Sequence, residues 1–182
     1  MATNLNTRPA RSGDNPFLKA VNFISTVAGW AAATMIVAAV FITCQMIFVR
    51  FVLNGSTVWQ TEAVIYLMVA STLIGLPYVQ RMRGHVNVDL IPLALSRGAR
   101  YWLAVLTSVL SITMVAVIFW YGYEFWHFAF DRNWKSETVW AVRLWIPYLA
   151  IPVGFGLLLL QLVADFVALV TGVDTPFGLE AN

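Results

Sequence analysis

Hydrophobic residues fill four long stretches of the chain, each ending at charged residues. The stretches cover residues 20–49, 63–80, 101–123 and 144–164, and the last has an apolar extension to residue 170. Charged side chains are costly in lipid, so the intervals between them mark segments able to cross a membrane. As helices, the last three stretches are about 27 to 35 Å long, close to the roughly 30 Å core of a bilayer. The pattern therefore predicts four membrane-spanning helices.

The first stretch is longer than a bilayer requires. It would measure about 45 Å as one helix, so we expect a long, tilted first helix. A cleavable signal peptide has an apolar core of roughly 7 to 15 residues, whereas this stretch continues to Val49, so we interpret it as an uncleaved anchor. The apolar runs lack the two-residue alternation of a membrane barrel, and only helices or closed barrels satisfy their backbone groups in lipid. The predicted fold class is an all-α integral membrane bundle.

The composition supports this class. The chain has 182 residues, of which 60% are hydrophobic and 11% charged, and its mean hydropathy is +0.75. A soluble domain carries about 25% charged residues, and a net charge of +2 is too small for a nucleic-acid surface. The single cysteine, Cys44, cannot form an internal disulfide. We expect a flexible cytoplasmic tail (1–18), a four-helix membrane domain (19–172) and a short cytoplasmic tail (173–182).

The distribution of Lys and Arg predicts the orientation. Seven basic residues precede the first span or lie between the second and third: Arg8, Arg11, Lys19, Arg81, Arg83, Arg97 and Arg100. Four lie on the opposite side: Arg50, Arg132, Lys135 and Arg143. Basic residues accumulate on the cytoplasmic side of membrane proteins. Both termini are therefore predicted to be cytoplasmic.

The predicted spans contain no ionisable residue, although a self-contained pump or proton relay normally places one inside the membrane. Their polar residues are hydroxyls and amides, which we expect to form contacts between helices: Thr43, Gln45, Ser71, Thr72, Ser108, Ser111, Thr113 and Gln161. A haem between helices is not expected, because His85 and His127 fall outside the spans and on opposite sides of the membrane. The sequence indicates neither an enzyme nor a cofactor in this chain.

Two segments outside the spans have distinctive compositions. Residues 81–100, RMRGHVNVDLIPLALSRGAR, combine arginines with apolar positions and a possible cap at Asn87 or Asp89. They predict a short helix lying in the membrane interface between spans two and three. Residues 120–145 are rich in Trp, Tyr and Phe. Such rings favour the headgroup level, or they contact another protein.

Several of these residues resemble the small membrane subunit of tripartite ATP-independent periplasmic (TRAP) transporters. The resemblance begins with Trp59 and Glu62, continues through Gly75 and includes the run RMRGHVNVDLIP. The fourth stretch, LWIPYLAIPVGFGLLLL, is similar to the Pro-containing helix entry and Pro-Val-Gly-Phe motif of that family. The resemblance covers roughly residues 19–171. One departure is Thr61, where many relatives carry a second acidic residue before Glu62.

The resemblance implies a non-enzymatic subunit of a sodium-coupled transporter in the bacterial inner membrane. In that family a large multi-pass permease subunit holds the substrate and sodium sites, and the small subunit braces it. A periplasmic binding protein delivers the solute, usually an organic acid. No cofactor is expected in this subunit, and sodium ions are expected in the large one. The alternatives are an independent four-helix carrier and the membrane anchor of a redox complex.

Two sets of candidate contact residues follow from the resemblance and the loop chemistry. The first set is expected to contact the large subunit or lipid: Trp59, Glu62, Arg81, Arg83, His85, Asp89, Pro152 and Gly154. The second set forms a mixed-charge patch expected to dock the binding protein through transient, charge-steered contact: Asp131, Arg132, Lys135, Glu137 and Arg143.

Overall fold

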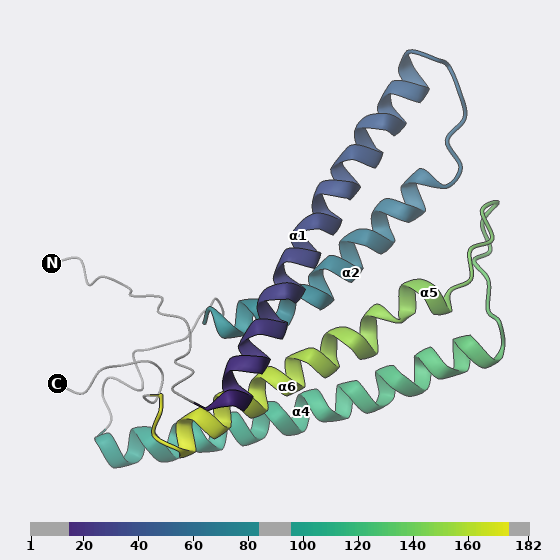
Figure 1. Ribbon diagram of the computed structural model, residues 1–182. Helices are drawn as coiled ribbons and strands as arrows, with labels where there is room; N and C mark the ends of the chain where they lie inside the picture. The colour runs from purple at the N-terminus through teal and green to yellow at the C-terminus, as the bar shows by residue number, and fades with distance from the viewer. Residues whose placement is uncertain (1–14, 84–95, 175–182) are drawn as a thin grey trace, which may run out of the picture.

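The computed structural model describes residues 15–83 and 96–174, and these residues are almost entirely helical (Figure 1). The helices are α1 (Pro16–Phe51), α2 (Gln60–Arg81), α4 (Arg97–Asp131), α5 (Trp145–Tyr148) and α6 (Ala150–Val170). By length and composition, α1, α2, α4 and the joined segment Trp145–Val170 can each cross a membrane. Within the described ranges there is no β-strand, only an isolated bridge in the loop after α4. The predicted all-α architecture with four spans is confirmed.

The helices extend beyond the charges that were expected to end them. The 36 residues of α1 and the 35 of α4 correspond to lengths of about 54 and 52 Å. Helix α4 continues for eight residues past the predicted limit at Tyr123 because its charged side chains find partners along the helix. Trp120 Nε1 donates to Glu124 Oε1 at 3.1 Å, and His127 Nδ1 lies 3.0 Å from Asp131 Oδ2. Charges mark where the hydrocarbon ends, whereas the helix continues into water.

Some expectations concern residues outside the described ranges. The predicted interfacial helix, with His85 and Asp89, lies outside them, as do most of both predicted tails. Helix α1 already begins at Pro16, where Asn15 caps it by accepting the Phe17 N–H at 3.2 Å. Asparagine before the first helical turn and proline within it are typical of a helix start.

Proline shapes the last span. Pro147 and Pro152 lack the N–H that an α-helix needs, and the helix is interrupted at Leu149 between α5 and α6. Pro152 is buried against the rest of the chain. The two prolines therefore account for the interruption between α5 and α6, which follow one another along the last span (Figure 1).

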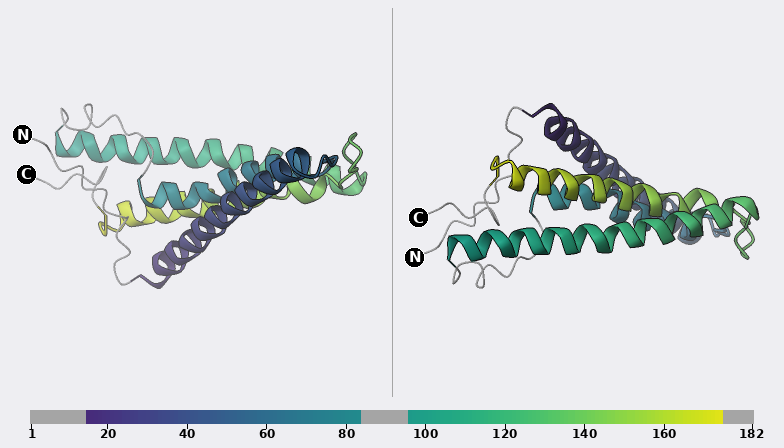
Figure 2. Two further views of the ribbon diagram at one scale, coloured as in Figure 1. Left: turned by 90° about the horizontal axis from the view of Figure 1, so that it is seen from above. Right: turned by 90° about the horizontal axis from the view of Figure 1, so that it is seen from below.

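The helices form two arms. Helix α1 packs along α2, α2 contacts α6, and α6 packs along α4. Both views of Figure 2 show α4 running beside α6 while α1 crosses them obliquely. We call the α1–α2 pair the first arm and α4 with α5 and α6 the second arm. The arms meet near the beginning of α1 and the end of α6 and separate toward the other end (Figure 1).

Small residues allow the arms to approach closely. Leu18 and Val21 of α1 pack against Ala164 and Ala168 of α6 in the core where the arms meet. A Cβ atom built on Gly154 of α6 would lie 2.7 Å from the carbonyl oxygen of Leu73 in α2. Without a hydrophobic driving force between helices in lipid, such backbone contact supplies the packing energy.

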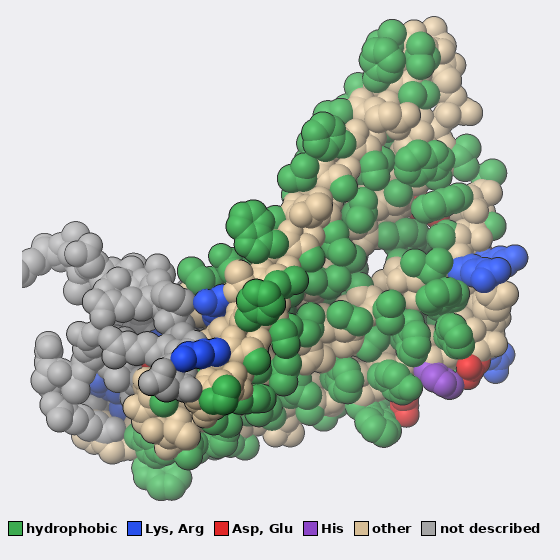
Figure 3. All heavy atoms as spheres, in the orientation of Figure 1, with side chains coloured by type: hydrophobic (Ala, Val, Ile, Leu, Met, Phe, Trp, Pro, Cys, Tyr) green, Lys and Arg blue, Asp and Glu red, His purple; other side chains and the backbone are tan. Residues whose placement is uncertain are grey.

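Apolar side chains also cover the outside of the molecule (Figure 3). Between 6% and 28% of the most apolar window of each span is buried within the chain. A water-soluble protein rarely exposes apolar patches on this scale, whereas lipid or another membrane subunit can cover them.

Candidate functional site

Buried polar side chains gather where the two arms meet. We call this group, contributed by α1, α2 and α6, the vertex cluster; it consists of Asn22, Ser25, Thr26, Gln80, Arg81, Gln161 and Asp165. Gln161 lies at its centre with no exposed surface. Ser25 Oγ donates to Gln161 Oε1 at 2.6 Å, and Gln161 Nε2 donates to Asp165 Oδ1 at 2.8 Å. In apolar surroundings the Ser25 bond holds α1 on α6, whereas the bond to Asp165 lies within α6 and orients the Gln161 amide.

Helix α2 joins the cluster through its last turn. Gln80 Nε2 donates to Asp165 Oδ2 at 3.0 Å, so each oxygen of this carboxylate accepts an amide hydrogen. Arg81 donates to the Asn22 carbonyl oxygen at 3.0 Å and to the Thr26 hydroxyl. The neighbouring Arg83 forms an ion pair with Asp174 beyond the end of α6. The two arginines predicted to contact another subunit or lipid thus bond within the chain.

Asp165 corrects the expectation that no span contains an ionisable residue. The predicted fourth span ended at Ala164, but α6 continues to Val170 and buries the Asp165 carboxylate against α2. A charge is tolerated there because the Gln80 and Gln161 amides supply donors. In the described parts of the chain, no group of three or more His, Cys, Asp or Glu side chains could hold a metal ion.

The polar residues of the spans divide into two groups. Gln161 contacts another helix as predicted, and Gln45 accepts from Gln60 of α2 at 3.4 Å. The hydroxyls of four other residues bond to a carbonyl oxygen of their own helix: Thr43, Ser71, Thr72 and Thr113. A hydroxyl can satisfy itself on the preceding turn, whereas an amide has too many donors and acceptors to do so.

A hairpin over residues 133–144 connects α4 to α5 at the other end of the molecule. The Ser136 N–H donates to Val142 O at 2.9 Å and the Leu144 N–H to Trp134 O at 2.8 Å. These bonds place Lys135 opposite Arg143 in an antiparallel bridge. Asn133 and Ala141, with φ values of 47° and 48°, occupy the left-handed region that the two bends of the hairpin require.

Side chains on one face of the hairpin contact the beginning of α2. Ser136 Oγ donates to Glu62 Oε1 at 3.2 Å. The rings of Trp59 and Trp140 have centroids 6.2 Å apart. The hairpin therefore joins the two arms a second time, where their helices have separated. Glu62 keeps a second oxygen, Oε2, that is buried without a hydrogen-bond donor from the described residues.

The structure brings the five predicted docking residues together at this end, but in different surroundings. Asp131 pairs with His127, and the Arg132 guanidinium lies 4.6 Å from the ring centroid of Phe128. Lys135, Glu137 and Arg143 are exposed on the hairpin. Within the mixed-charge patch, Asp131 and Arg132 thus contact side chains of α4, whereas the other three residues are exposed on the hairpin.

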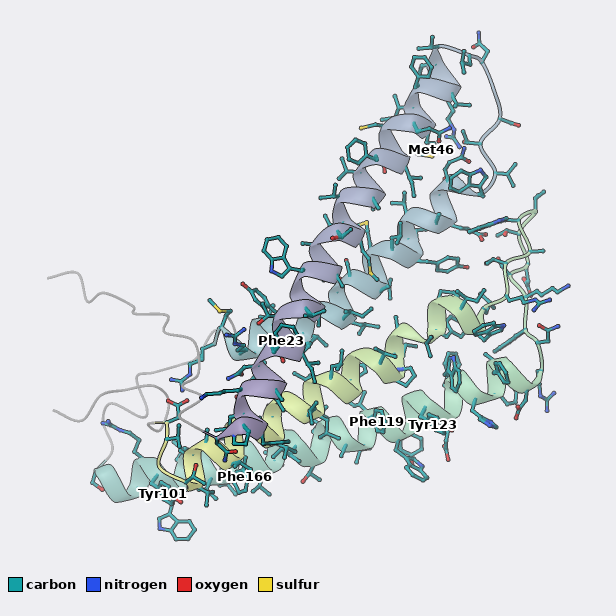
Figure 4. All side chains as sticks on the ribbon, viewed as in Figure 1. Phe23, Met46, Tyr101, Phe119, Tyr123 and Phe166 are labelled. Carbon is teal, nitrogen blue, oxygen red and sulfur yellow. The ribbon has the colours of Figure 1, made fainter. Side chains whose placement is uncertain are left out.

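Pro152 and Gly154, predicted to lie at the contact with another subunit or lipid, are buried inside the chain. Nearby, Phe119 of α4 packs on Gly156, where a Cβ atom would lie 3.1 Å from its ring. Figure 4 shows Phe119 and Tyr123 on the same helix; Phe119 contacts α6, whereas Tyr123 is exposed beside other rings of α4. These motif residues maintain the packing of α6 on its neighbours.

An open apolar crevice of about 250 Å³ lies between α1, α2 and α6, lined by Phe23, Val27, Ile74 and Leu157 among others. Phe23 lies where α1 crosses the second arm (Figure 4). The lining offers no acid, base or nucleophile for catalysis. The sequence gives no local signal for this crevice, because its walls come from three separate spans.

Comparison with known proteins agrees with the resemblance. Residues 39–172 match the family described as tripartite ATP-independent periplasmic transporters, DctQ component. The chain is also 22% identical, over 179 residues, to the C4-dicarboxylate TRAP transporter small permease protein DctQ of Vibrio cholerae serotype O1. That alignment covers 86% of this chain and 76% of the relative.

Proposed function

The chain belongs to the DctQ component family of TRAP transporters, and we propose that it braces a large permease subunit for sodium-coupled uptake of a solute delivered by a periplasmic binding protein. The solute class expected from the resemblance is an organic acid. A small permease subunit with four apolar helices is a multi-pass inner-membrane protein. The vertex cluster carries the bracing role, because its buried polar groups connect helices of both arms instead of lining a path.

The contact with the large subunit is proposed for the end where the arms separate. Trp59 is 41% exposed there although it packs on Trp140. The second oxygen of Glu62 lacks a donor among the described residues, and a buried carboxylate oxygen is costly when unpaired. A hydrogen-bond donor of the large subunit would satisfy it. The exposed apolar faces of α1 and α4 provide further surface for a membrane partner.

The orientation is proposed from the basic residues. The start of α1 and the end of α6 lie on one side, since Leu18 contacts Ala164 and Ala168. The excess of Lys and Arg on that side favours the cytoplasm. The hairpin then faces the periplasm, where a binding protein can reach Asp131, Arg132, Lys135, Glu137 and Arg143.

Reconstitution tests the proposed function. Proteoliposomes are prepared with this chain alone, with the large subunit alone, and with both, each supplied with the binding protein and an inward sodium gradient. We expect uptake only when both membrane subunits are present. Uptake by this chain without the large subunit would identify an independent carrier. Uptake by the large subunit alone at the full rate would show that bracing is not required, and a haem absorption band in the purified chain would indicate a redox anchor.

A further inference from the structure

The most informative feature outside the vertex cluster is a pair of like charges on the hairpin. Lys135 and Arg143 are opposite each other in the antiparallel bridge. They form a non-hydrogen-bonded pair, in which the two Cα atoms are only about 4.5 Å apart and the side chains project from the same face. Like charges directly opposite destabilise such a pair. The hairpin therefore holds two cations together at an energetic cost.

No neighbouring anion offsets this cost. Neither the Lys135 ammonium nor the Arg143 guanidinium has an acidic partner within residues 15–83 and 96–174. Glu137 lies two residues from Lys135 but pairs with neither cation. Asp131, the nearest acid on α4, is engaged with His127. The pair is thus available to an anionic group from outside the described chain.

The contacts of the hairpin with α2 determine which way the pair faces. Successive side chains along an extended segment point to opposite faces. Ser136 and Val142 occupy the half-buried face, and Ser136 bonds to Glu62 of α2. Lys135 and Arg143 therefore project from the opposite face, away from α2, and both are exposed. The cation pair is presented outward on an anchored hairpin.

The pair follows about two helical turns of α4 beyond the apolar interval. Glu124 marks the end of the apolar interval, and α4 continues for seven more residues to Asp131, or about 10 Å. The headgroup layer is only about 5 to 8 Å thick on each side of the hydrocarbon core. The hairpin rises from that end of α4 toward α2 (Figure 1). A soluble protein can reach the pair in this position more readily than a lipid phosphate can.

We propose that Lys135 and Arg143 form the cationic docking point for surface carboxylates of the periplasmic binding protein. This inference rests on the proposed function and refines it, because it selects two of the five patch residues as the attractive element. Transient partners that meet repeatedly benefit from long-range attraction, which raises the association rate and weakens with salt. Carboxylates between the two cations also remove the repulsion within the hairpin.

The test measures association of the binding protein with the two-subunit complex in nanodiscs at about 50 and 500 mM salt. We expect K135E/R143E to slow association about tenfold at low salt, with a much smaller difference at high salt. The K135Q/R143Q variant should fall between it and the wild type. K135E/R143E should unfold near the wild-type temperature, because it keeps a like-charged pair and removes no contact of the hairpin with α2. K135Q/R143Q should be at least as stable as the wild type, because it removes the repulsion between the two side chains. Reversing acidic residues on the binding protein to Lys should restore association with K135E/R143E.

Arg50 provides the matched control. It is exposed at the end of α1, on the side proposed to be periplasmic. Among the described residues its guanidinium bonds only Thr57 in the adjoining loop. R50E should change the association rate by less than about twofold. If K135E/R143E behaves like R50E, or if its defect is the same at both salt concentrations, the inference is wrong. A defect seen only with anionic lipids in the nanodisc would assign the pair to lipid phosphate and also overturn it.

Failure of this inference can be separated from failure of the proposed function. Wild-type uptake that does not need the binding protein would contradict the proposed function. Uptake that needs the binding protein, combined with unchanged association of K135E/R143E, would contradict only the role of the cation pair.

Discussion

The two ends of this molecule use polar residues in opposite ways. In the vertex cluster, Gln161 is buried and Asp165 half-buried, and their side chains bond one another and side chains of two other helices. On the hairpin, Lys135 and Arg143 are exposed and lack an anionic partner among the described residues. Polar groups that hydrogen-bond one another across helices in an apolar medium stabilise one arrangement of those helices. Unsaturated ones at a water-facing end are available to a partner.

The first prediction concerns the sides of the membrane on which the two ends lie and has an all-or-none outcome. In a Cys44→Ala background, Val139→Cys on the hairpin and Ser96→Cys before α4 are treated with a membrane-impermeant maleimide in intact spheroplasts. Val139 is 89% exposed, so its cysteine should react at once. Ser96→Cys should react only after permeabilisation. The reverse pattern would invert the proposed orientation and place the hairpin in the cytoplasm.

The second prediction tests the close approach that lets the arms meet. Gly154→Leu introduces a side chain where a Cβ atom alone would lie 2.7 Å from the backbone of α2. Overpacking of this kind costs about 1 to 3 kcal/mol, and here the obstacle is backbone, so we expect the upper end of that range. Thermal unfolding of the purified protein in detergent measures it. Gly98→Ala is the control, because no atom lies within 4 Å of a Cβ atom built on Gly98, and its stability should stay close to that of the wild type. Equal stability of the two variants would contradict the packing assignment.

The third prediction tests the hydrogen bonds of the vertex cluster. Gln161→Leu removes the amide that bonds Ser25 and Asp165, leaving buried groups unpaired. We expect a loss of about 1 to 2 kcal/mol of stability, in line with buried polar contacts in membrane proteins. Gln45→Leu is the matched control, because Gln45 is exposed and its bond to Gln60 is long. Unfolding titrations in mixed micelles compare the two variants. Equal losses of stability would mean that the buried hydrogen bonds of Gln161 contribute no more than the exposed bond of Gln45.

The last prediction concerns the weaker join between the arms. Ser136→Ala removes the hydroxyl that donates to Glu62 of α2. Because this contact lies near water, we expect a stability loss of only about 0.5 kcal/mol, but faster hydrogen exchange in residues 133–144. Thr113→Ala is the control, since that hydroxyl bonds its own helix. Exchange in the hairpin that does not change would show that the Glu62 contact does not hold it.

The sequence allowed correct prediction of the helices but not of their ends. Charges at Arg50, Arg81 and Arg143 correctly separated the four spans. Glu124 and Asp165 did not end helices, because Trp120 supplies a donor to one and Gln80 and Gln161 supply donors to the other. A prediction that ends each helix at the first charged residue treats that residue as unpaired. It therefore underestimates the length of a helix whose charged side chains have hydrogen-bond partners.

The candidate contact residues were predictable to different degrees. The charged loop after α4 was identifiable from its composition, but the bridge between Lys135 and Arg143 depends on a register that composition does not contain. Gln161 was recognised as a contact between helices, whereas Asn22 and Ser25 were not singled out. Pro152 and Gly154 were recognised by motif, and the structure places both inside the chain.

The sequence by itself determined that four helices cross a membrane, because the cost of placing charges and unpaired backbone groups in lipid depends on local composition. Only the tertiary structure decided which polar side chains form hydrogen bonds between helices and which remain exposed to a partner. A hydrogen bond needs its atoms within about 3 Å, and the partners of Gln161 and Glu62 are 136 and 74 residues away along the chain. The angle between the arms, and therefore those distances, follows from how small residues such as Gly154 pack.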